Sequence, residues 1–195
     1  LVVVTGHSGE GKTSAVLDAL ARLEDAGLRA KGIVQLARHD ASGRRVGFDV
    51  RNLATGEQVP LADEGPRNTG EHGTRFVFHE EAFRMAAQAL RAAEAGAGAA
   101  PLVVDEIGPV ELRGEGHARA LRRVLRRKRP EVLIVTVRPH LVAACIEWIG
   151  PGSVTLVPVG TIDDASGAIV DAVLERQAGT DPDGPGDVRR VLNST

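Results

Sequence analysis

The most constraining feature of the sequence is a glycine-rich segment, GHSGEGKT at residues 6–13, which follows the apolar run LVVV. The segment has the spacing G-x-x-x-x-G-K-[ST], with Gly6, Gly11, Lys12 and Thr13 at the fixed positions. Its glycines allow the backbone to wrap closely around an oxyanion with the N–H groups pointing inward. The helix expected after it would add the positive end of its dipole. The segment therefore predicts a buried strand, a phosphate-binding loop and a helix, in that order.

We expect this loop to bind the phosphate groups of a nucleoside triphosphate. Lys12 would reach the β- and γ-phosphates, and the Thr13 hydroxyl would bind Mg²⁺. For His7, Ser8 and Glu10 the simpler interpretation is a solvent-facing side chain at a variable position of the loop. The predicted binding residues are Gly6, His7, Ser8, Gly9, Glu10, Gly11, Lys12, Thr13 and Ser14.

Apolar strands alternate with helices along most of the remaining chain. This alternation predicts a mostly parallel sheet with helices on both faces, which is the three-layer α/β sandwich of P-loop NTPases. An antiparallel hairpin is expected in addition at residues 33–50. Further strands are expected at residues 1–6, 58–61, 76–79, 101–108, 131–137 and 153–159, and helices at 12–27, 80–96, 115–129, 139–149 and 162–176.

The length and composition favour an ordinary globular enzyme or binding protein. A chain of 195 residues suits one domain, which we expect over residues 1–177, followed by a flexible tail over 178–195. Cys145 is the only cysteine, which excludes an intramolecular disulfide and a multi-cysteine metal site. No apolar run approaches the ~20 residues of a membrane span. We therefore expect a cytoplasmic protein with no membrane partner.

Two adjacent carboxylates, Asp105 and Glu106, end the apolar strand at 101–108. Ligands of open α/β sheets bind at the carboxyl ends of strands, so this pair would face the phosphate loop. Asp105 would then hold Mg²⁺ through its water shell, and Glu106 would polarise a water molecule for attack on the γ-phosphate. The alternative is an acidic pair on the surface at the end of a strand.

Three further side chains each have two interpretations. Thr136, near the end of the strand at 131–137, would sense the γ-phosphate or position the water, or it is a plain strand residue. Arg138 would supply positive charge in the transition state, or it is a surface arginine. Glu111 would brace the loop after Asp105, or it faces solvent. The predicted catalytic residues are Lys12, Glu106 and Thr136, and the predicted metal ligands are Thr13 and Asp105.

Several segments resemble the small P-loop nucleoside-triphosphatases of the THEP1 type, also described as nucleotide kinase-like. They are TGHSGEGKTS, KGIVQLAR…RRVGFDV, GEHGTRFVFHEEAF, PLVVDEIGPVEL and EVLIVTVR, which together span roughly residues 1–160. DEIGPVEL is the most specific, because it fits the family's D-E-I-G-x-x-E-L at Asp105, Glu106, Ile107, Gly108, Glu111 and Leu112. The resemblance implies slow, Mg²⁺-dependent hydrolysis of several nucleoside triphosphates with weak base preference. The arginine-rich helix and the acidic tail depart from it.

Three functions stay open on the sequence. The first is an NTPase that hydrolyses ATP, GTP and other triphosphates, since neither Asn-Lys nor Thr-Lys is present to read guanine. The second is a P-loop small-molecule or nucleotide kinase, in which the loop 62–75 with Arg67 and Arg75 would cover the acceptor. The third is a nucleotide-gated adaptor that binds a protein partner through the arginine-rich segment 119–129. A net charge of −2 and the lack of stacking aromatics argue against nucleic acid.

Overall fold

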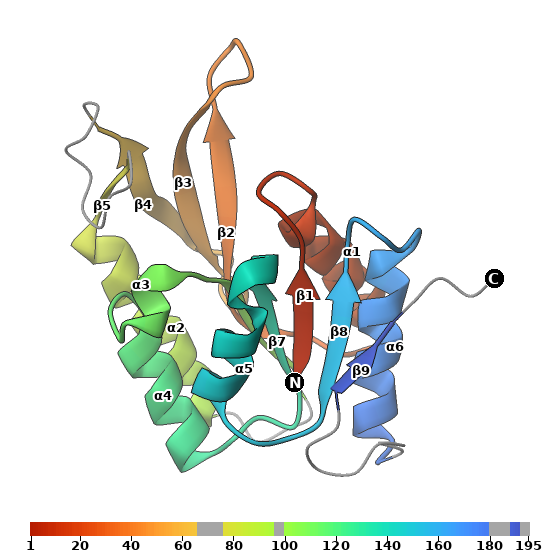
Figure 1. Ribbon diagram of the computed structural model, residues 1–195. Helices are drawn as coiled ribbons and strands as arrows, with labels where there is room; N and C mark the ends of the chain where they lie inside the picture. The colour runs from red at the N-terminus through yellow and green to blue at the C-terminus, as the bar shows by residue number, and fades with distance from the viewer. Residues whose placement is uncertain (66–75, 96–99, 180–187, 192–195) are drawn as a thin grey trace.

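The computed structural model describes residues 1–65, 76–95, 100–179 and 188–191, which form one mixed sheet with helices on both faces (Figure 1). The order across the sheet is β5-β4-β3-β2-β6-β7-β1-β8-β9. The strands are β1 (Val2–Thr5), β2 (Lys31–His39), β3 (Arg45–Asn52), β4 (Gln58–Glu64), β5 (Phe76–Phe78), β6 (Leu102–Ile107), β7 (Leu133–Val137), β8 (Val154–Pro158) and β9 (Val188–Arg190). The helices are α1 (Lys12–Asp25), α2 (Glu80–Ala95), α3 (Pro109–Leu112), α4 (Ala118–Arg127), α5 (Val142–Ile149) and α6 (Ala165–Gln177).

The central strands are buried on both faces, which explains why their sequences are continuously apolar. Successive residues of β1 point to opposite sides, so Val3 packs in one core and Val2 and Val4 pack in the other. The first core is closed by α2, α4 and α5, and the second by α1 and α6. This confirms the predicted three-layer α/β sandwich.

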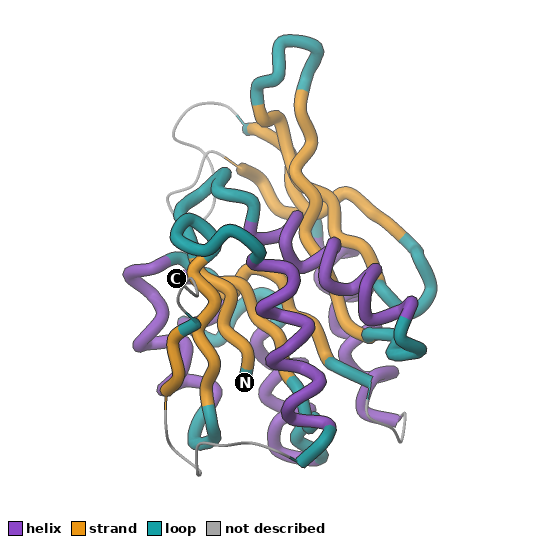
Figure 2. Tube along the Cα trace, turned by 90° about the vertical axis from the view of Figure 1, so that its right-hand side faces the viewer, coloured by secondary structure: helices purple, strands orange, loops and turns teal. Residues whose placement is uncertain are grey.

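The predicted hairpin is present and belongs to a larger antiparallel extension made of β2, β3, β4 and β5. Strand β2 pairs in parallel with β6 at Lys31–Ile33 and then continues into the hairpin. Gly32 is required at this crossing, because a Cβ there would lie 2.0 Å from the Val103 carbonyl oxygen, and its φ is +109°. Both views show the hairpin projecting past the edge of the sheet at which the loop after β1 lies (Figures 1 and 2).

Several element boundaries differ from the sequence expectations. The strand expected at 58–61 extends to Glu64, and the rest of the loop expected at 62–75 falls mainly outside the described residues. The helix expected from residue 162 begins at Ala165, because the Asp164 carboxylate accepts the Gly167 N–H and caps that end. The helix expected at 115–129 spans Ala118–Arg127, and the one at 139–149 starts with a 3₁₀ turn at Pro139–Leu141.

The segment expected to be a flexible tail, 178–195, contains the short strand β9, which pairs in parallel with β8 at the edge of the sheet. Residues 180–187 and 192–195 lie outside the described part, so the domain boundary stays a prediction. Among the residues described, no helix combines the length and apolar character needed to cross a bilayer.

Candidate functional site

The loop between β1 and α1 has the backbone that its glycines predict. Gly9 and Gly11 have φ of +87° and +88°, in the left-handed region that favours glycine. Gly6 packs tightly, because a Cβ there would lie 2.6 Å from Val159 Cγ2 of the segment after β8. Helix α1 begins directly after this loop at Lys12, so its amino end faces the concave side of the loop.

Lys12 is buried in the loop that precedes it. Its Nζ donates hydrogen bonds to the carbonyl oxygens of Gly6 and His7, both at 2.9 Å. An ammonium group has three donors, so these two contacts leave one for a ligand. Lys12 therefore places a positive charge inside the loop, where the sequence predicts the phosphates.

Asp105, on β6, is the buried centre of the site, with only 1% of its surface exposed. Its Oδ2 accepts hydrogen bonds from Thr13 Oγ1 and the Gln35 N–H, both at 2.9 Å, and its Oδ1 accepts from Thr136 Oγ1 at 2.5 Å. Burial raises the pKa of this carboxyl, and the three hydrogen bonds oppose that rise. The structure thus brings Thr13, Asp105 and Thr136 together, because β6, β7 and β1 are neighbours in the sheet.

Glu106 has an unusual backbone, with φ of +63°, the only positive φ of a non-glycine residue in the described part of the chain. Its N–H donates to Thr136 Oγ1 at 2.8 Å, which anchors this conformation. Its side chain is 30% exposed, and Oε1 accepts from Arg138 Nη2 at 3.1 Å. The buried Thr136 hydroxyl therefore bridges Asp105 and Glu106, and Arg138 contacts the carboxylate of Glu106.

Glu111 braces the turn after β6, as one of its two sequence interpretations proposed. Only 6% of it is exposed, and its Oε2 accepts the Gly108 N–H at 3.0 Å at the start of α3. Burial raises the pKa of Glu111 to about 7 and lowers the pKa of the adjacent buried His117 to about 4. Glu111 Oε1 and His117 Nδ1 are 3.5 Å apart. Between pH about 4 and about 7 both side chains are therefore neutral.

Sequence reasoning missed two residues of the site, Gln35 and Arg45. Gln35, on β2, donates to Asp105 through its backbone N–H and through its side-chain amide to the Asp105 carbonyl at 3.3 Å. Arg45, on β3, donates from Nη1 to Ser8 Oγ in the phosphate loop at 3.2 Å. A polar residue inside the apolar run GIVQL was a usable signal for Gln35. No local pattern marks Arg45, because its contact depends on how the hairpin folds over the loop.

His7, Ser8 and Glu10 are exposed, as expected, and each of them also makes a hydrogen bond. Glu10 Oε2 accepts the His7 N–H at 2.6 Å, so this carboxylate closes the loop on itself. Ser8 contacts Arg45, whereas Ser14 is exposed on the first turn of α1.

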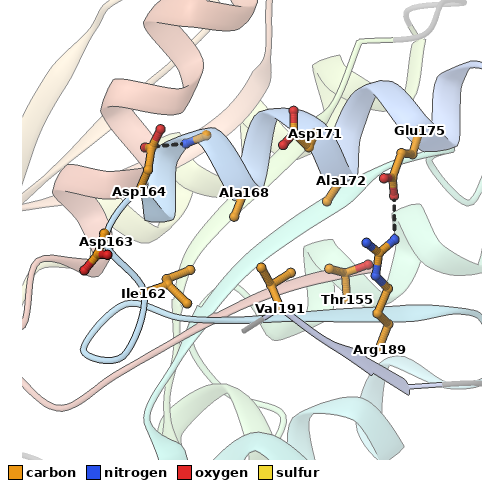
Figure 3. Close-up of a pocket in the computed structure, with 11 residues that line it drawn as sticks. Thr155, Ile162, Asp163, Asp164, Ala168, Asp171, Ala172, Glu175, Arg189 and Val191 are labelled. Carbon is orange, nitrogen blue, oxygen red and sulfur yellow. Dashed lines mark hydrogen bonds and ion pairs between the residues drawn. The ribbon is translucent and has the colours of Figure 1, made fainter. Parts of the chain in front are cut away.

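A separate cavity of about 320 Å³ lies between α6 and the edge strands β8 and β9 (Figure 3). Its wall carries Asp163, Asp164, Asp171 and Glu175, and Glu175 pairs with Arg189 at 3.0 Å. Carboxylates repel a triphosphate, and no residue of the loop 6–14 lines this cavity. The loop 6–14 and the ends of β6 and β7 therefore stay the candidate phosphate site.

The chain resembles known proteins over most of its length. The model of a family described as "NTPase" matches residues 1–158. Nucleoside-triphosphatase THEP1 of Methanopyrus kandleri is 33% identical over 179 residues, which cover 89% of this chain and 95% of that protein. A cancer-related nucleoside-triphosphatase homolog of Mus musculus is 32% identical over 148 residues, or 71% of this chain and 74% of that protein.

Two solved structures share the fold. A human cancer-related nucleoside triphosphatase superposes with a TM-score of 0.67 at 23% identity, over 92% of this chain and 97% of that one. THEP1 from Aquifex aeolicus superposes with a TM-score of 0.61 at 20% identity, over 89% of this chain and 96% of that one. The family match over residues 1–158 and the 33% identity to the Methanopyrus kandleri protein show that the chain belongs to the NTPase family, as its phosphate loop and DEIGPVEL segment predict.

Proposed function

We propose that the chain hydrolyses several nucleoside triphosphates, ATP and GTP among them, to the diphosphate and phosphate in a Mg²⁺-dependent reaction with weak base selectivity. The enzyme class, nucleoside-triphosphatase, follows from the family. The observation that supports the detailed proposal best is the hydrogen bond between Thr13 and Asp105. It joins the phosphate loop to the acidic end of β6, so that one ligand can contact both.

The loop residues 6–14 would bind the β- and γ-phosphates through backbone N–H groups, the amino end of α1 and the ammonium of Lys12. The two carbonyls that Lys12 contacts hold its amine within the loop. A preorganised ammonium loses little side-chain entropy when the phosphates bind.

The donor set at Thr13 and Asp105 fits Mg²⁺, which prefers hard oxygen ligands and usually keeps several waters. A carboxylate and a hydroxyl within 2.9 Å of each other supply such oxygens. In the part of the chain that the structure describes, no group of three or more His, Cys, Asp or Glu side chains is placed so that it could hold a metal ion by itself. When bound, Mg²⁺ would neutralise charge on the β- and γ-phosphate oxygens.

Glu106 is our proposed general base. The oxygen of a water molecule forms a bond to the γ-phosphorus, the bond from that phosphorus to the β,γ-bridging oxygen breaks, and the water proton passes to the Glu106 carboxylate. Thr136 acts as a positioning residue, because its buried hydroxyl holds the Glu106 N–H and the Asp105 carboxylate together. Weak base selectivity is supported by the lack of Asn-Lys and Thr-Lys pairs in the sequence.

The test is phosphate release from ATP, GTP, CTP and UTP with Mg²⁺, comparing the wild type with Glu106→Gln. We expect the variant to bind fluorescent ADP and a non-hydrolysable ATP analogue like the wild type and to lose turnover by about 100-fold or more. Glu57→Gln, which removes an exposed carboxylate, is the matched control and should hydrolyse normally. Equal turnover in Glu106→Gln would contradict the assigned base. Binding without release in the wild type would instead favour the kinase or the adaptor hypothesis.

A further inference from the structure

Arg45 contacts the phosphate loop from an element that lies outside the β1–α1 unit. Its Nη1 donates to the hydroxyl of Ser8, the third residue of the G-x-x-x-x-G-K-T segment, at 3.2 Å. The guanidinium arrives from the first residue of β3, at the base of the hairpin turn. The hairpin of β2 and β3 and the loop after β1 lie at the same end of the sheet in both views (Figures 1 and 2).

The hairpin fixes the place of Arg45 through local contacts. The Asp40 carboxylate accepts hydrogen bonds from the N–H groups of Ser42 and Arg44, which closes the turn. Arg45 then lies opposite His39 in the register of β2 and β3. The guanidinium of Arg45 lies 5.3 Å from the centre of the Phe48 ring, a cation–π distance. An aromatic ring beneath the side chain restricts the motion of the guanidinium.

Two other arginines of the described residues, Arg44 beside Arg45 in the sequence and Arg138 after β7, contact carboxylates. Arg44 pairs with the carboxylates of Asp40 and Glu64 within the antiparallel strands. Arg138 is bound to the Glu106 carboxylate, so its guanidinium positions the proposed base. In the described part of the chain, the guanidinium of Arg45 contacts the phosphate loop itself.

We propose that Arg45 contacts the γ-phosphate of the bound triphosphate and stabilises the negative charge that spreads over its oxygens during transfer to water. This inference rests on the proposed function. The loop wraps around the phosphates, so a group hydrogen-bonded to Ser8 lies at the rim of the phosphate site. A planar guanidinium offers parallel donors that match two phosphate oxygens. Arg45 gives and takes no proton, because a guanidinium stays protonated, and the water proton still goes to Glu106.

The test separates contact with the γ-phosphate from general effects on the fold. Arg45→Ala, Arg45→Lys and the control Arg51→Ala are compared with the wild type. Arg51 lies on the same strand and its guanidinium donates hydrogen bonds to Gln58. Arg51→Ala therefore measures the effect of removing an arginine side chain from β3 that makes no contact with the phosphate loop in the described interactions. For each protein, one measures the affinity for fluorescent ADP and for a non-hydrolysable ATP analogue with Mg²⁺, the phosphate-release rate and the thermal midpoint.

We expect Arg45→Ala to lose turnover by about 100-fold or more, since an arginine at this place in related chemistry has effects of that size. Its affinity for the ATP analogue should fall about tenfold, the loss of one charge-assisted hydrogen bond, with ADP binding unchanged. Arg45→Lys should recover little of the rate, because an ammonium cannot form the two parallel bonds. Arg51→Ala should behave as the wild type.

An Arg45→Ala rate within about threefold of the wild type, or an equal loss of affinity for ADP and the ATP analogue, would overturn the inference. A wild type that hydrolyses no triphosphate would refute the proposed function instead. Even then the difference between the two affinities decides whether Arg45 contacts the γ-phosphate.

Discussion

The buried carboxyl of Glu111 gives a prediction whose size follows from the structure. In the folded protein its pKa is about 7, raised from 4.5 chiefly by burial; the Glu106 carboxylate adds to this rise, whereas the Gly108 N–H and Arg113 oppose it. Between about pH 4.5 and pH 7 the folded protein therefore binds a proton at Glu111 that the unfolded chain has released. The free energy of unfolding must fall across this range as the pH rises. A shift of this size corresponds to about 3 kcal/mol.

The substitution Glu111→Gln removes this titration and keeps an oxygen that can accept the Gly108 N–H. We expect the variant to gain about 3 kcal/mol relative to the wild type between pH 4.5 and pH 7.5. The wild type alone does not reveal the effect, because His117 acts in the opposite direction. Its lowered pKa makes stability rise with pH from about 4 to about 6.5, and the two slopes offset each other. The difference between wild type and variant isolates Glu111.

The assay is urea unfolding followed by circular dichroism at several pH values, with the same slope against urea required of both proteins. Glu115→Gln, which removes a carboxylate that is about half exposed four residues along the chain, is the matched control. A difference for Glu111→Gln that stays constant within about 1 kcal/mol would refute the reasoning, since it would mean that burial does not hold the proton on Glu111.

Two further predictions concern the support of the site. Thr136→Val should cost about 1–3 kcal/mol and reduce turnover, because the buried Glu106 N–H loses its acceptor, whereas Thr136→Ser should recover most of both in thermal melts and rate assays. Gly32→Ala should cost at least about 3 kcal/mol or prevent folding, because the new Cβ would collide with the Val103 carbonyl, whereas Gly43→Ala, which enters open space, should cost about 1–2 kcal/mol of backbone strain. Similar melting temperatures for these two glycine variants would contradict the steric argument.

The parallel part of the sheet was predictable because each of its units is local. A strand, a glycine and a helix follow one another in the sequence, and the carboxyl ends of such strands meet at one edge. The neighbouring positions of Thr13, Asp105 and Thr136 follow from that rule, although their roles stay proposals. The short helix α3 was not expected, because four residues are too few to show a helical period.

The rest of the site depends on contacts that no local pattern contains. Gln35 reaches Asp105, and Arg45 reaches the phosphate loop, only because β2 lies beside β6 in the strand order. Arg67 and Arg75, the predicted cover of a kinase acceptor, lie outside the described residues.

The arginine-rich helix uses part of its charge within the fold. Arg123 and Arg127 approach Glu94 of α2, and Arg122 lies 4.9 Å from the centre of the Trp148 ring. A protein partner for this helix, the exclusion of nucleic acid and a cytoplasmic location all stay predictions.

The left-handed backbone of Glu106 has a consequence for how this protein would change under laboratory selection. That conformation costs a glutamate about 1–2 kcal/mol of steric strain, whereas a glycine adopts it without this strain and loses only more backbone entropy on folding. Selection for heat resistance alone would therefore favour glycine at this position. The selected protein would be more thermostable but would lack its proposed base. Any effort to stabilise this chain has to screen for turnover at the same time, because at residue 106 the two objectives are opposed.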